Sequence, residues 1–165
     1  MSYRSVLVVA ICAIVAACMQ PEPAKSRLTG AWRAQVRFSG GPLAAIKDLE
    51  FMYVIHADGT LMESSNYDEA PPVPPAYGMW RQTMTSAYEA HYEFFVTQAP
   101  AHTAGLAGGW PPGGRGVLEE TITMSPDGQR FSSHLHLQLL DTHGQPTDQS
   151  GDAEVHAVRI APVAH

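Results

Sequence analysis

Apolar side chains recur at every second position along most of the chain beyond residue 28, and this alternation limits the possible folds. In residues 30–38, for example, the apolar positions of one face are Trp32, Ala34, Val36 and Phe38. A period of two places successive side chains on opposite faces of a β-strand. No stretch long enough for a helix carries a clear helical stripe. The sequence therefore predicts an all-β domain.

Turn-forming residues divide this pattern into eight expected strands. Asp58-Gly59 favours a tight hairpin because both residues tolerate positive φ, and Ser125-Pro126-Asp127-Gly128 is a type I turn sequence. The expected strands are 30–38, 49–56, 60–66, 78–84, 87–97, 117–124, 129–141 and 153–160. Antiparallel strands joined in sequence order favour an up-and-down barrel, which has no exposed edge and can hold one small ligand. A sandwich of similar strand number is the alternative.

Two segments between the expected strands are rich in residues that interrupt pairing. Residues 67–77 contain four prolines, and residues 98–116 are rich in Gly, Pro and Ala. Loops of this length often form lids or rims. Tyr77 and Trp110 would then contact a ligand at the mouth of a barrel. The alternative for the second loop is that Trp110 merely anchors it.

The first seventeen residues have the three parts of a secretory signal. Arg4 supplies a positive charge, residues 5–17 are almost continuously apolar, and small residues precede Cys18. The apolar run is too short to span ~30 Å of hydrocarbon. Residues 1–17 are therefore expected to be a cleaved helical signal peptide.

The ending Val15-Ala16-Ala17-Cys18 resembles the lipobox of bacterial lipoproteins. That resemblance implies cleavage before Cys18, lipidation of its thiol, and a lipid-anchored protein of the bacterial cell envelope. In a Gram-negative cell, Met19 in place of an aspartate favours the periplasmic face of the outer membrane. Residues 18–27 are polar and contain proline, as expected of a tether. The domain is then expected to span 28–165.

The charge pattern argues against a nucleic-acid-binding protein, and the cysteine content argues against a disulfide-stabilised domain. The formal net charge is −6, and no cluster of Lys and Arg occurs, so nucleic acid is not an expected partner. The two cysteines, Cys12 and Cys18, belong to the expected signal and lipid site. No disulfide is therefore expected in the domain, which must be stabilised by packing.

The two ends of the domain carry a family resemblance. Leu28-Thr29-Gly30-Ala31-Trp32 resembles the Gly-x-Trp signature of lipocalins and related calycins, and Arg159 lies where those folds place an arginine across the tryptophan. In the family, Gly30, Trp32 and Arg159 would be structural. A guanidinium over an indole contributes ~0.5–2 kcal/mol by cation–π stacking.

The order of short motifs along the chain is similar to that of a group of small secreted bacterial lipocalin-like domains. These motifs include Asp58-Gly59-Thr60, Gly78-Met79-Trp80 and Val158-Arg159-Ile160. The resemblance implies a calycin-like barrel and no particular activity. The insertion 99–115 lengthens a loop that is shorter in typical sequences of the group.

An aromatic row and one carboxyl group are the candidate interior residues. Tyr88, Tyr92 and Phe94 share a face and are candidate ligand contacts, although such rows are also ordinary core. Glu120 shares a face with Leu118, Ile122 and Met124 and would enter the barrel with them. A buried carboxyl needs partners or a proton, so Glu120 and Tyr92 are the candidates for acid–base catalysis.

Three histidines are candidates for a metal site. His134 and His136 project from one face of an expected strand, and His156 lies on the strand expected to pair with it. The apolar residues occupy the opposite face, which places the histidines on the outside of the barrel. A solvated surface is thus the preferred interpretation, and neither a metal nor another cofactor is expected.

The favoured hypothesis is an envelope lipoprotein whose barrel binds a small apolar or amphipathic molecule. The sequence lacks a nucleophile elbow and a phosphate-binding loop. The competing hypotheses are an isomerase, cyclase or dehydratase that uses the barrel interior, and a structural or partner-binding lipoprotein with a filled barrel.

Overall fold

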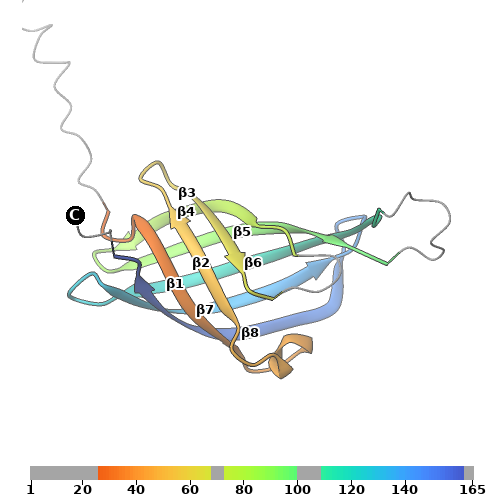
Figure 1. Ribbon diagram of the computed structural model, residues 1–165. Helices are drawn as coiled ribbons and strands as arrows, with labels where there is room; N and C mark the ends of the chain where they lie inside the picture. Colours follow the sequence, from red (N-terminus) through yellow and green to blue (C-terminus); the bar gives the residue numbers. More distant parts are fainter. Residues whose placement is uncertain (1–25, 68–72, 100–108, 162–165) are drawn as a thin grey trace, which may run out of the picture.

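The first and last strands of the domain pair with each other and close the sheet into a barrel. The computed structural model describes residues 26–67, 73–99 and 109–161, and every strand in these ranges is antiparallel to its two neighbours. The strand order around the barrel, β1 to β8, is the order of the sequence (Figure 1). This confirms the expected eight-stranded up-and-down barrel and excludes the sandwich.

The strands account for most of the described chain. They are β1 (Gly30–Phe38), β2 (Glu50–Ile55), β3 (Thr60–Ser65), β4 (Ala76–Met84), β5 (Ala87–Thr97), β6 (Pro112–Met124), β7 (Arg130–Leu140) and β8 (Pro146–Arg159). Within the described ranges, the helical structure is a single 3-10 turn, η1 (Pro42–Ala45). The same ranges contain no helix with the length and hydropathy needed to cross a bilayer.

Three strands begin earlier than the sequence pattern predicts: β4, which begins at Ala76 instead of 78, and, by a wider margin, β6 and β8. β6 begins at Pro112 instead of 117, and β8 begins at Pro146 instead of 153. The additional residues are glycine-rich in β6 and polar in β8. These strand ends extend beyond the core, so their sequences lack the alternation of apolar and polar residues that marks a half-buried strand. The loop expected over 98–116 is correspondingly shorter.

The strands run alternately in opposite directions, so the connections between them are divided between the two ends of the barrel. The turns β2–β3, β4–β5 and β6–β7 lie at one end, together with the described start and end of the chain (Figure 1). The ends of β1, β3, β5 and β7 and the starts of β2, β4, β6 and β8 lie at the other end, which we call the mouth. The core fills the barrel from the closed end toward the mouth.

Trp32 and Arg159, the pair that the family resemblance indicated, are in contact at the closed end of the barrel. The guanidinium carbon of Arg159 lies 4.1 Å from the centre of the Trp32 ring. Arg159 also donates hydrogen bonds to the carbonyl oxygens of Thr29, at 2.9 Å, and Gly128, at 3.1 Å. Gly30 has φ 141°, and a Cβ there would lie 2.4 Å from Arg159 Nη1, so only glycine fits. The structure thus places Arg159 across the Trp32 ring, as the resemblance implied.

Candidate functional site

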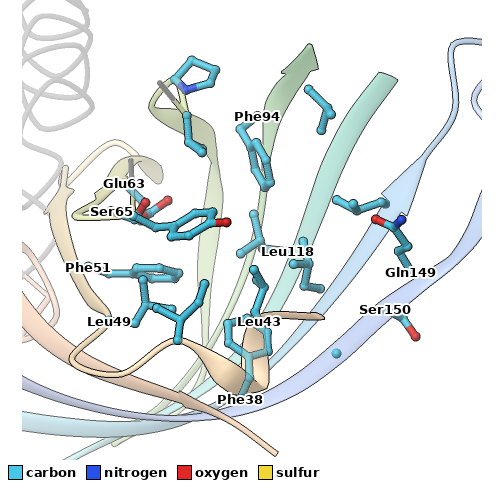
Figure 2. A pocket seen from close by; sticks show the side chains of 18 of the residues that line it. Phe38, Leu43, Leu49, Phe51, Glu63, Ser65, Phe94, Leu118, Gln149 and Ser150 are labelled. Carbon is cyan, nitrogen blue, oxygen red and sulfur yellow. The ribbon is translucent and has the colours of Figure 1, made fainter. Parts of the chain in front are cut away.

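A cavity of about 540 Å³ opens at the mouth of the barrel (Figure 2). Its wall is mainly apolar, because the inward positions near the mouth carry aliphatic and aromatic side chains. These are Phe38, Leu43, Ile46, Leu49, Phe51, Phe94, Leu118, Leu137 and Leu139. Ser65, Gln149 and Ser150 add polar groups, with Ser65 across the cavity from the other two (Figure 2). Such a lining suits an apolar molecule with a few polar contacts.

Glu63 is the acidic side chain among the described residues of this wall. It lies on β3 between Tyr53 of β2 and Ala76 of β4, and its alternation with Leu61 turns it inward. The residue is only 5% exposed, and its Oε1 has no hydrogen-bond partner among the described residues. A buried carboxyl oxygen without a partner is unfavourable, so Glu63 is the feature of the cavity that most needs an explanation.

A second carboxyl group, that of Glu120, is buried deeper in the barrel. Glu120 is the next inward-facing residue of β6 after Leu118, in the direction away from the mouth. Tyr92 of β5 donates a hydrogen bond of 2.8 Å to Glu120 Oε2, and Ser133 of β7 donates another to Oε1. The ring of Tyr53 packs edge-on against Tyr92, with centroids 6.3 Å apart. The Tyr53 hydroxyl is buried without a hydrogen bond of normal geometry. Glu120 thus has partners, whereas Glu63 has an unpaired oxygen.

Burial dominates the protonation of this cluster. Removal from water, and secondly repulsion by Glu120, raise the pKa of Glu63 to about 8. Burial also raises the pKa of Glu120, although the hydrogen bonds from Ser133 and Tyr92 act in the opposite direction. Burial and the charge of Glu120 hold the pKa values of Tyr53 and Tyr92 well above the usual value. Glu63 is therefore mostly protonated at neutral pH.

The structure brings the two candidate catalytic residues together but does not open them to the cavity. Tyr92 and Glu120 are hydrogen-bonded, and both are almost completely buried. Neither contributes to the cavity wall, whereas Leu118 and Phe94, the adjacent inward residues toward the mouth, do. A molecule in the cavity would contact Glu63 and not Glu120.

The candidate ligand contacts are divided between cavity, core and surface. Phe94 and Trp110 line the cavity. Tyr88 and Tyr92 are buried in the core outside it. Tyr77 is 63% exposed and lies on the outer surface, because Ala76 takes the inward position at the start of β4. Tyr77 therefore has no place in the cavity wall.

The three histidines lie on the outer surface, where each is exposed. His134 Nδ1 lies 3.1 Å from Glu154 Oε1, and His136 Nδ1 lies 2.7 Å from Asp152 Oδ1. In residues 26–67, 73–99 and 109–161, no three ligand-type side chains group in a way that could hold a metal ion. The pairs are exposed, so each contributes little to stability.

The sequence pattern did not indicate Glu63 as a residue of the cavity wall. The signal for Glu63 was the Asp58-Gly59 turn, which fixes the register Ile55 to Leu61 and hence Tyr53 to Glu63. The expected lipidation site Cys18 and the expected signal peptide lie outside the described residues.

Comparison with known proteins adds no family assignment. No protein-family model matches the sequence, and no curated protein matches it significantly.

Proposed function

We propose that this protein binds a small amphipathic molecule in the mouth of its barrel. The observation that carries the proposal is the cavity of about 540 Å³, with an apolar wall and one buried carboxyl group. Ligand cavities in proteins commonly measure ~300–1,000 Å³ and combine apolar walls with a few polar groups. An apolar body would replace water along the Phe and Leu side chains, and a polar group would face Glu63.

A cavity-filling substitution tests this proposal. The neutral dye N-phenyl-1-naphthylamine, which fluoresces in apolar surroundings, is expected to bind one-to-one. Ser65→Trp would fill the cavity and is expected to weaken binding at least tenfold. Ser64→Trp is the matched control, because Ser64 lies on the exposed face of β3 and does not line the cavity. Absence of dye binding to the unaltered protein, or equal binding to both variants, would contradict the proposal.

We also propose that the domain is tethered to a bacterial envelope membrane through lipid on Cys18. The support is the sequence Val15-Ala16-Ala17-Cys18 after a charged start and an apolar run. An anchored barrel would remain close to amphipathic molecules that partition into membranes.

A further inference from the structure

The described wall of the cavity carries one carboxyl group and no basic side chain. Glu63 lines it, and no Lys, Arg or His does so in the described part of the chain. Nor does any described basic side chain form an ion pair with Glu63, although three Arg–carboxylate pairs occur elsewhere among the described residues. Among these described residues, a fatty acid anion would thus meet a carboxyl group and no basic side chain.

The Oε1 atom of Glu63 is buried, and the described residues provide no hydrogen-bond donor to it. Tyr92 and Ser133 direct their hydroxyl groups at Glu120, and the Glu63 neighbours Tyr53 and Ala76 leave Oε1 without a hydrogen bond. Any ligand group beside this oxygen would be held best if it donated a hydrogen bond and carried positive charge. Aromatic side chains of the wall, among them Phe51, Phe94 and Trp110, supply π faces that also attract cations.

From this geometry we infer that the ligand is an amphiphilic amine, whose protonated nitrogen donates to Glu63 and whose apolar body fills the mouth of the barrel. The inference rests on the ligand-binding function proposed above. The chain's formal net charge of −6 would assist the approach of such cations.

Binding of an amine would be coupled to loss of a proton from Glu63. The described titratable groups around it are Glu120 on β6, Tyr53 on β2, Tyr92 on β5 and Tyr67 in the same cavity wall, and none supplies a positive charge. Because the pKa of Glu63 is about 8, about one molecule in ten has it ionised at pH 7. The ammonium group would select this ionised form, so amine affinity should rise as pH approaches 8.

The test compares three ligands that differ only in head group. Calorimetry measures the affinities of octylamine, octanol and octanoate for the unaltered chain and for Glu63→Gln and Glu119→Gln. Glu119 is a matched control because it lies on the same sheet but faces solvent. At pH 8 we expect octylamine to bind at least tenfold more tightly than octanol, with octanoate the weakest. Glu63→Gln should remove this preference, and Glu119→Gln should preserve it.

The pH dependence gives a readout that a merely structural role of Glu63 would not produce. Octylamine remains protonated from pH 6 to 9, so its affinity should increase nearly tenfold from pH 6 to 7 and level off above pH 8. Octanol affinity should stay flat. The inference is overturned if octanol or octanoate binds as tightly as octylamine, or if Glu63→Gln keeps the preference. In those cases, continued binding of N-phenyl-1-naphthylamine would leave the proposed function standing, whereas loss of all binding would remove both.

Discussion

Glu63 makes the stability of the barrel depend on pH. Its pKa in the folded protein is about 8, above the ordinary value of 4.5, so between these values the folded state holds the proton more tightly than the unfolded chain does. The contribution of Glu63 to the free energy of unfolding should therefore be largest below about pH 4.5, and it should fall as pH rises to about 8. The total loss is at most about 5 kcal/mol.

Urea unfolding of the unaltered chain and of Glu63→Gln at pH 5, 7 and 9 measures this effect. The amide does not ionise, so Glu63→Gln should lose less stability between pH 5 and pH 9, and should be the more stable protein at pH 9. Glu119→Gln should follow the unaltered chain, because Glu119 is exposed. Parallel pH profiles for the unaltered chain and Glu63→Gln would show that the carboxyl group is not desolvated as described.

At the scale of elements, β5 and β6 fit together because a glycine faces an aromatic ring. Gly116 pairs with Phe94, and a Cβ on Gly116 would lie 2.1 Å from a carbon of the Phe94 ring. Gly116→Ala should therefore displace the ring, reduce the free energy of unfolding by about 1–3 kcal/mol and weaken dye binding in the cavity. Both quantities are measurable by urea unfolding and dye titration.

A double substitution shows whether Gly116→Ala acts by crowding the Phe94 ring or by changing the backbone. Phe94→Leu combined with Gly116→Ala should cost less than the sum of the two single changes, because the smaller side chain makes room for the new methyl group. Additive effects on stability would mean that the ring and the glycine do not compete for the same space.

The strands differ in how clearly their sequences indicate which face is buried. In β6, Leu118, Ile122 and Met124 establish the inward face, so the inward position of Glu120 could be predicted. In β3, Leu61 faces inward and Met62 outward, so alternation alone does not choose a face, and the orientation of Glu63 depends on its pairing with β2. The polar start of β8 pairs with β7 beyond the core. A hydrophobic pattern cannot predict this part of the strand, because it has no apolar face.

At the scale of the whole molecule, barrel closure could be predicted because its two partners are chemically distinctive. Trp32 and Arg159 are far apart in sequence, and each belongs to a short motif, so their contact could be anticipated. The cavity could not be predicted, because its described walls come from seven strands and from η1, and its volume depends on how large and small side chains combine. Whether a small barrel is filled or hollow is a property of the assembled core.

The arrangement of the two barrel ends has a consequence for the proposed membrane tether. Arg27 donates a hydrogen bond of 3.2 Å to the Ser125 carbonyl oxygen in the β6–β7 turn, so the chain enters the barrel at the closed end. The cavity lies at the opposite end. A tether that precedes residue 26 would thus hold the domain by its closed end and leave the mouth accessible.

Replacement of Cys18 tests the tether and this arrangement together. Expressed in a bacterium, the unaltered chain should fractionate with membranes, and its amino-terminal peptide should gain the mass of acyl groups. Cys18→Ser should lack that mass and should no longer be anchored by acyl chains. Dye affinity should be the same for the lipidated protein in detergent and for the protein expressed without residues 1–18, because the cavity is remote from residue 26. An unmodified Cys18 would contradict the anchor, whereas a change in affinity on lipidation would contradict the separation of the two ends.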